Sequence, residues 1–128
     1  MKHYMKKSEA TQSNKIHAWI RWYMQTYKRN CAVELKHTRG KDIMPIREIY
    51  DHQKTNLNDF KDSFVWKIDD AGFREKPFDY IGTWRGDAFV AIRYTKNIYI
   101  IDIDEIQKIT AKSLDEEKAK KLAFSVII

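Results

Sequence analysis

The sequence predicts a single α/β domain in which helices flank a central mixed β-sheet. Three observations lead to this fold class. The chain has 128 residues, of which 43% are hydrophobic and 13% aromatic, so it can form one domain with a real core. Segments with the apolar spacing of helices alternate with short apolar runs that are typical of strands. No linker, repeat or low-complexity tract interrupts residues 1–128, so we expect one domain over this length.

Local signals set the expected ends of several elements. Residues 1–8 are basic and are expected to be flexible. Ser8 or Ser13 can cap the first helix, and Pro45 suits the start of the second. Ser113 begins a capping-box pattern before the last helix. In chain order we expect a helix over Ser8–Tyr27, a strand over Cys31–His37, a helix from Pro45 to about Asn58, strands over Ser63–Ile68 and Phe78–Thr83, a hairpin of Phe89–Thr95 with Ile98–Ile103, a helical turn over Asp104–Lys108 and a helix that ends near Ala123.

The charge distribution favours a polyanionic partner. The net charge is +6, and residues 1–41 hold ten Lys and Arg against two Glu. A basic N-terminal third is typical of proteins that bind nucleic acids, although a solvated lysine-rich face has the same composition. From charge alone the two interpretations are equally good.

Cysteine usage and hydropathy exclude several classes of protein. Cys31 is the single cysteine, which excludes a disulfide framework and a cysteine-based zinc site and fits a reducing cytoplasm. No apolar run approaches the roughly 18 residues that a membrane span needs, and no apolar segment follows the basic N-terminus. We therefore expect a cytoplasmic protein with no membrane span and no signal peptide.

The motif with the clearest chemistry is Glu34-Leu-Lys36, inside the expected strand Cys31–His37. Side chains alternate along a strand, so Glu34 and Lys36 share one face while Val33 and Leu35 take the other. Burying this charged pair costs free energy. A metal-dependent phosphodiesterase uses such a pair, because the carboxylate binds magnesium and the lysine stabilises charge on the phosphate. An ordinary ion pair on a half-exposed strand is the other interpretation.

The surroundings of this pair resemble a known family. Glu34-Leu-Lys36-His-Thr-Arg-Gly-Lys41, followed by Asp51-His-Gln53, is similar to a segment of the Holliday-junction resolvases of the PD-(D/E)XK nuclease superfamily and of small phage-associated proteins of that kind. In these relatives a Gly-Lys turn follows the Glu-x-Lys strand, and a helix then carries a His-Gln pair. Lys76-Pro-Phe-Asp79 resembles the Pro-x-Asp element that supplies their other carboxylate. With the later hairpin, the resemblance covers most of the chain from Ser8 onward.

The resemblance implies a restriction-endonuclease-like core and an endonuclease that hydrolyses phosphodiester bonds in DNA, branched junctions included. It implies Mg²⁺ as the cofactor, which Mn²⁺ can replace, with Glu34 and Asp79 as metal ligands. Lys36 and Gln53 are then expected to act beside them in catalysis. A homodimer matches the near two-fold symmetry of a junction. If the gene is carried by a phage, the protein is expected to act in the host cytoplasm.

The order of the motifs differs from that of the family. Relatives have the Pro-x-Asp strand before the Glu-x-Lys strand, whereas Asp79 follows Lys36 in this chain. Either the core is circularly permuted, or Asp79 is not the second carboxylate. In the usual order, the Glu-x-Lys position after Asp79 falls on Ala91-Ile-Arg93, and Ala91 cannot bind a metal. A complete site therefore needs Glu34 and Lys36 beside Asp79.

Three further acidic residues are candidate metal ligands. Asp69 and Asp70 can each add a carboxylate, but they stand beside a glycine-containing turn where aspartate is common anyway. Glu9 lies in the expected first helix, where some relatives keep an acidic residue near the metal. For each of the three, a position outside the metal site is the alternative interpretation.

The basic turn after the motif strand is a candidate phosphate contact. Thr38, Arg39 and Lys41 directly follow Glu34 and Lys36 in the chain. Contacts from such a turn to the phosphates would fix the position of the DNA without reading its bases. A solvent-exposed loop is the alternative for these three residues.

Two other classes of function stay open at the level of sequence. A non-catalytic nucleic-acid-binding module would keep the nuclease fold with a decayed site, as the permuted motif order allows. A protein-interaction inhibitor that borrows the fold is the third possibility. The apolar residues 124–128 suit either an interface between subunits or a cap on the core.

Overall fold

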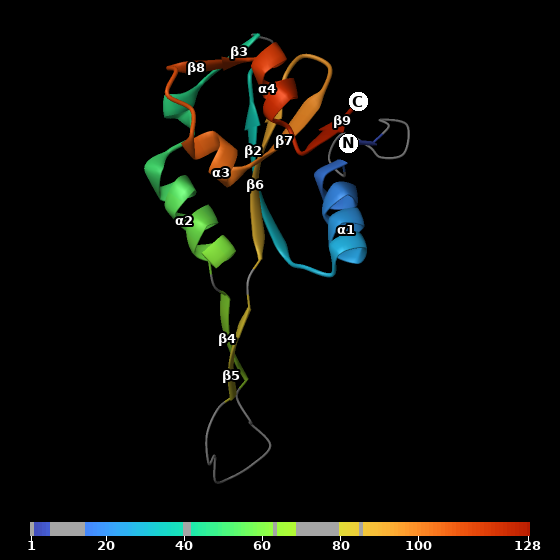
Figure 1. Cartoon of the computed structure of the whole chain (residues 1–128), viewed down its shortest axis with the longest axis vertical. Helices are drawn as coiled ribbons and strands as arrows, with labels where there is room; N and C mark the ends of the chain where they lie inside the picture. The colour runs from blue at the N-terminus through green and yellow to red at the C-terminus, as the bar shows by residue number, and fades with distance from the viewer. Residues whose placement is uncertain (1, 6–14, 40–41, 63, 69–79, 85) are drawn as a thin grey trace.

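The computed structural model describes residues 2–5, 15–39, 42–62, 64–68, 80–84 and 86–128. Its centre is a five-stranded mixed β-sheet in the order β1-β9-β7-β6-β2, which is drawn with its flanking helices in Figure 1. The strands of this sheet are β1 (His3–Met5), β2 (Cys31–His37), β6 (Asp87–Arg93), β7 (Ile98–Asp102) and β9 (Ser125–Ile127).

Helices and two small sheets surround the central sheet. The helices are α1 (Lys15–Tyr27), α2 (Asp51–Asp62), α3 (Ile103–Gln107) and α4 (Glu116–Leu122), with a 3₁₀ turn over Ile46–Glu48. β3 (Ile43–Pro45) pairs antiparallel with β8 (Ser113–Asp115), and β4 (Phe64–Ile68) pairs antiparallel with β5 (Tyr80–Trp84). The β4–β5 hairpin extends away from the rest of the protein (Figure 1). The predicted α/β fold with a mixed, helix-flanked sheet is confirmed.

The pairing of β2 with β6 sets the direction of the motif side chains. The two strands run parallel, with Glu34 opposite Val90 and Lys36 opposite Ile92. Parallel neighbours need a crossover connection, and here that connection contains α2. Directly paired residues point to the same face of a sheet. Glu34 and Lys36 therefore lie on the same face of the sheet as the buried side chains of Val90 and Ile92.

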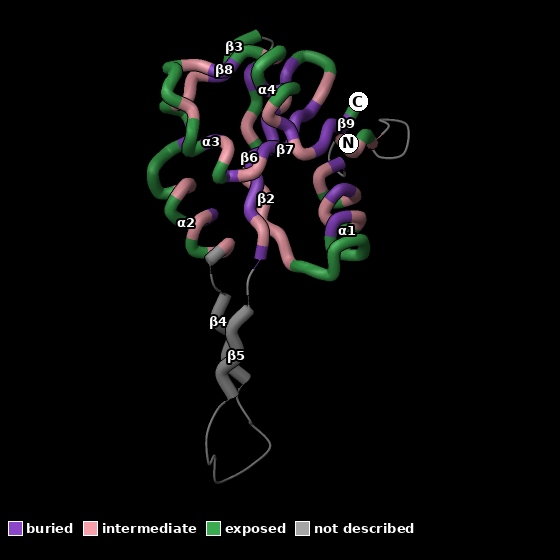
Figure 2. Tube along the Cα trace, viewed as in Figure 1, coloured by how far each residue is buried: buried purple, intermediate pink, exposed green. Residues whose placement is uncertain are grey.

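Each face of the sheet is covered by its own hydrophobic cluster. Val90 and Ile92 belong to the cluster that also includes α2, α3 and α4 residues, such as Leu57. Phe89 and Ala91 belong to the cluster on the opposite face, against Trp19 of α1. Burial is extensive along β6, β7 and β9, as Figure 2 shows. Such burial on both faces explains why β6 is a nearly continuous apolar run.

Two expected helix starts are wrong, for local reasons. The second α-helix begins at Asp51, whereas Pro45 ends β3 with an extended backbone (φ −64°, ψ 127°) and is the N-cap of the 3₁₀ turn over Ile46–Glu48. The φ angle of proline suits both a strand and a first helical turn, so this signal was ambiguous. Ser113 begins β8, and α4 is instead capped by Asp115, whose side chain accepts a hydrogen bond from the Lys118 N–H at 2.8 Å. Ser8 and Ser13 lie outside the described residues.

The two ends of the chain pair inside the sheet. His3–Met5 forms β1, in contrast to the flexible end expected for residues 1–8. β1 runs parallel to β9, and β9 runs antiparallel to β7. The apolar C-terminus is thus a core strand, with Val126 and Ile127 nearly fully buried. In the part of the chain that the structure describes, no helix is long and apolar enough to cross a membrane.

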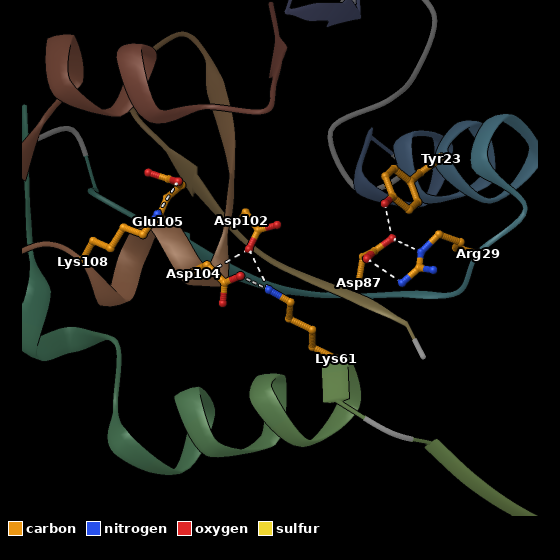
Figure 3. Close-up of polar contacts among 8 residues, drawn as sticks. All are labelled: Tyr23, Arg29, Lys61, Asp87, Asp102, Asp104, Glu105 and Lys108. Carbon is orange, nitrogen blue, oxygen red and sulfur yellow. Dashed lines mark hydrogen bonds and ion pairs between the residues drawn. The ribbon is translucent and has the colours of Figure 1, made fainter. Parts of the chain in front are cut away.

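Asp87 ties the α1–β2 connection to the start of β6 (Figure 3). Its carboxylate accepts hydrogen bonds from Arg29 through Nε at 2.7 Å and Nη2 at 3.0 Å, and another from the Tyr23 hydroxyl. Burial alone would raise the pKa of Asp87, but the hydrogen bonds from Arg29 and Tyr23 outweigh it and lower the pKa below its usual value. A second ionic contact joins the end of α2 to α3, between Lys61 and both Asp102 and Asp104.

The Asp87 carboxylate is expected to stabilise the fold at neutral pH. A carboxyl group with a lowered folded-state pKa contributes stability above its unfolded-state pKa, near 4, and loses it as the pH falls through the folded-state pKa. Asp87→Asn should therefore lower the free energy of unfolding at pH 7 by about 1–2 kcal/mol, with a smaller loss at pH 3. Urea denaturation at the two pH values measures this. Equal losses at both, or no larger loss than for the exposed Asp59→Asn, would contradict it.

Candidate functional site

The Glu34–Lys36 pair lies on the outermost strand of the central sheet, on the face that α2 covers. The Lys36 ammonium is 3.9 Å from Oε1 of Glu34, and the two side chains are 14% and 35% exposed. Lys36 is therefore the more enclosed charge, and the partial exposure of Glu34 leaves its carboxylate accessible from solvent. The shared orientation of these two residues, predicted from strand alternation, is confirmed. Val33 packs on the opposite face, in the cluster against α1.

Gln53 connects α2 to this pair. Its Nε2 donates a hydrogen bond of 2.8 Å to Oε1 of Glu34, while its Oε1 accepts one of 3.1 Å from the Tyr50 N–H. The Tyr50 carbonyl accepts from the N–H of Lys54 at 3.0 Å, so Tyr50 is the N-cap residue and Gln53 the third residue of the helix. Because its oxygen is used by the helix start, the Gln53 amide presents its NH₂ group to Glu34.

Tyr50 completes the group, and it was not among the site residues predicted from the sequence. The Lys36 ammonium lies 4.8 Å from the centroid of the Tyr50 ring, within the range of a cation–π interaction. The expected helix from Pro45 placed Tyr50 in the middle of a helix. A glutamine three residues later is the signal of a capping box, but tyrosine is not a preferred N-cap residue, so the pattern was not recognised.

A cavity of about 580 Å³ opens beside these residues. It lies where β2, β3 and the segment before α2 meet, and Lys36, Arg39 and Tyr50 reach it with charged or aromatic groups. Its remaining lining is Leu35, His37, Thr38, Ile43, Pro45 and Glu48. The volume is in the range of small-ligand pockets and can hold one nucleotide unit.

The turn after β2 is placed differently from the expectation at one of its three residues. Thr38 is 5% exposed, and both its N–H and its hydroxyl donate to the Arg93 carbonyl, at 2.9 and 3.1 Å. Thr38 therefore extends the β2–β6 pairing, and the hydrogen of its hydroxyl is engaged by the Arg93 carbonyl. Arg39 is exposed, in a left-handed conformation (φ 57°), and lines the cavity. Lys41 lies outside the described residues.

Magnesium fits Glu34, but the described residues give a partial ligand set. Mg²⁺ binds through one or two carboxylates and keeps several waters, so Glu34 suits one position. Nowhere in the described ranges do three or more His, Cys, Asp or Glu come together as a metal site. Asp79, Asp69, Asp70 and Glu9 all lie outside those ranges. Convergence of Asp79 with Glu34 therefore stays a prediction.

The thiol of Cys31, at the start of the same strand, does not provide alternative chemistry. Burial, together with the charge of Asp87, raises its pKa to about 11. A thiol with this pKa is protonated at neutral pH and is a poor nucleophile or metal ligand. Cys31 therefore adds neither a nucleophile nor a metal ligand to Glu34 and Lys36.

No protein-family model matches this chain, and no curated protein is found to match it in sequence.

The Gln53 bridge should contribute measurably to stability. Gln53→Ala removes hydrogen bonds to Glu34 and to the Tyr50 N–H, so we expect the free energy of unfolding to fall by about 1–2 kcal/mol. Gln53→Glu should cost more at pH 7 than at pH 4, because it places a second carboxylate against Glu34. Urea denaturation of both variants tests the bridge, with Gln25→Ala on the exposed side of α1 as control. Values equal to that of the control would show that the bridge does not form.

Proposed function

We propose that the protein is a metal-dependent endonuclease that hydrolyses phosphodiester bonds in DNA. The observation that carries this proposal is the meeting of Glu34, Lys36 and Gln53 on one face of β2, beside a cavity that Arg39 also lines. Gln53 comes from a helix 19 residues away in the chain from Glu34. A structural ion pair on a strand does not require this third polar group, or an adjoining cavity whose charged lining residues are Lys36, Arg39 and Glu48.

The fold supports the same proposal through the order of its elements. A Glu-x-Lys strand is followed by a turn, and then by a helix that carries His52-Gln53. Gln53 of this helix contacts the strand through its hydrogen bond to Glu34. This is the relationship that the resemblance to the PD-(D/E)XK nucleases implies. We infer a restriction-endonuclease-like core in which the motif order is circularly permuted, with Asp79 as the second carboxylate.

Each residue of the site has a part in this mechanism. Glu34 and Asp79 would hold Mg²⁺, which Mn²⁺ can replace, and the bound ion would supply Lewis acidity to the scissile phosphate. The Lys36 ammonium stabilises negative charge that grows on the phosphate oxygens, in a setting with little solvent. Gln53 holds the Glu34 carboxylate in one orientation through its hydrogen bond. Arg39 contacts a neighbouring phosphate and fixes the position of the DNA.

The charge of the chain supports DNA as the proposed substrate. The excess of Lys and Arg over residues 1–41 favours a polyanion, and a junction or other branched DNA is the proposed substrate. A homodimer would match the symmetry of a junction. We propose that the protein acts in the cytoplasm, which would be that of the host if the gene is carried by a phage.

One observation favours a second candidate, a nucleic-acid-binding module without catalysis. Oε1 of Glu34 already accepts from Gln53 and lies near Lys36, and the described residues bring no cluster of metal ligands to it. A carboxylate held in this way can be a structural group in a decayed site. The two candidates differ in metal binding and in cleavage, not in their affinity for DNA.

Cleavage should depend on both charged residues of β2. Glu34→Gln and Lys36→Met should each lower the rate of DNA cleavage by about 100-fold or more, because each removes a group that acts on the reacting phosphate. Labelled four-way junctions, duplexes and single strands, incubated with Mg²⁺ or Mn²⁺, provide the assay. The matched controls are Glu105→Gln and Lys108→Met, which alter the ion pair on α3 (3.3 Å) in Figure 3. No cleavage by the wild type, or equal rates in Glu34→Gln, would reject the nuclease.

Metal binding should depend on Asp79 as well as on Glu34. We expect Mn²⁺ binding, measured by isothermal titration calorimetry, to be lost in Glu34→Gln and in Asp79→Asn, because each removes one of two carboxylate ligands. Asp59→Asn, an exposed position on α2, serves as control. Unchanged binding in Asp79→Asn would exclude Asp79 as a ligand. DNA binding without any binding of Mn²⁺ would instead favour the non-catalytic module.

A further inference from the structure

Tyr50 presents a large aromatic surface beside the candidate site. The residue is 53% exposed, although its neighbour Ile49 is 1% exposed and belongs to the core. Leaving an aromatic ring in solvent forgoes the free energy that its burial would contribute to folding. The N-cap position does not call for tyrosine either, since Ser, Thr, Asp and Asn are preferred there. Helix capping therefore does not account for the aromatic ring at this position, and more than half of the residue is left exposed to solvent.

The Tyr50 ring is held in place from several sides. Its backbone is fixed by the hydrogen bond from its N–H to Gln53 and by the buried side chain of Ile49. The Lys36 ammonium contacts the ring at 4.8 Å from its centroid. The His52 ring lies nearly parallel to it, with an angle of 9° between the planes and 5.8 Å between the centroids. His52 is exposed as well, so the two rings form an ordered aromatic surface that is open to solvent.

We propose that Tyr50, together with His52, is a stacking surface for an unpaired nucleobase of the DNA substrate, an inference that rests on the proposed function. An aromatic ring can stack on the face of any of the four bases, so this contact does not depend on the DNA sequence. The cavity that Tyr50 lines also contains Lys36 and Arg39. One sugar separates a base from its phosphate. A base stacked on Tyr50 would therefore place that phosphate near Lys36 and Arg39.

This surface selects a class of substrate. In a continuous duplex the faces of each base are covered by the bases above and below, so Tyr50 has no face to contact. A base at a junction, a bulge, a gap or in a single strand exposes its face at little cost, because it is already unstacked or unpaired. The enzyme would therefore prefer DNA with an unpaired nucleotide next to the scissile phosphate.

The test uses DNA with the fluorescent base 2-aminopurine at a single position. Three substrates carry it in the same sequence: a continuous duplex, a duplex with a one-nucleotide bulge at that position, and a single strand. Binding is measured without divalent metal, so that hydrolysis does not interfere. Stacking on Tyr50 should change the fluorescence of the bulged and single-stranded DNA when wild-type protein binds, because the base exchanges its neighbouring bases for the Tyr50 ring. Binding to both with unchanged fluorescence would overturn the proposal, and this measurement needs no variant.

Two variants of Tyr50 separate the ring from the hydroxyl. Tyr50→Leu should lower the affinity for bulged relative to duplex DNA by about 5- to 150-fold, the range that loss of one base–aromatic stack gives. Tyr50→Phe keeps the ring and should keep the ratio. Tyr27→Leu is the matched control, since Tyr27 is 45% exposed but belongs to α1, on the opposite side of the sheet. An affinity ratio that Tyr50→Leu leaves unchanged would overturn the proposal.

Failure of the stacking surface and failure of the nuclease give different results. If the wild type cleaves DNA but Tyr50→Leu keeps both the fluorescence change and the affinity ratio, the stacking surface is rejected and the nuclease is retained. If no DNA is cleaved but the fluorescence change depends on the Tyr50 ring, the surface is retained and the protein is a binding module for unpaired DNA.

Discussion

The burial of β6 on both faces is the constraint on which the rest of the structure depends. Five consecutive residues, Ala88 to Ile92, are each 2% exposed or less, and they contribute alternately to the two hydrophobic clusters. Helix α1 packs on one side of this strand, and α2, α3 and α4 pack on the other. Its hydrogen bonds then fix β2 in one register, which directs Glu34 and Lys36 toward α2. A shift of β2 by one residue would turn both charges toward α1.

The parts of the fold that the sequence predicted are those with strong local patterns. The strand Cys31–His37 was placed correctly because four of its seven residues are apolar, and the β6–β7 hairpin because two apolar runs stand on either side of Lys96-Asn97. The three-residue strands β1 and β9 have no comparable pattern, and only their pairing with each other and with β7 makes them strands. The α-helix expected from Pro45 begins later, because the backbone angle of proline is compatible with both a strand and a helix start.

The candidate site shows the same division between local and long-range information. Strand alternation predicted that Glu34 and Lys36 share a face, and the resemblance pointed to Gln53. The distance between Gln53 and Glu34 depends on how α2 packs against the sheet, which no short stretch of sequence specifies. Thr38 was expected to contact phosphate because it follows the motif. Its burial against Arg93 results from strand pairing across 55 residues of the chain.

Because β2 lies at the edge of the sheet, the candidate site can lose its order without global unfolding of the protein. Among the described strands β2 has one hydrogen-bonded neighbour, whereas β6 and β7 each have two. Amide hydrogens in β2 should therefore exchange with solvent through local openings of low free energy, while those of β6 and β7 exchange only on global unfolding. Substitutions that loosen β2 can then disorder Glu34 and Lys36 while the melting temperature, set by the two hydrophobic clusters, stays nearly constant.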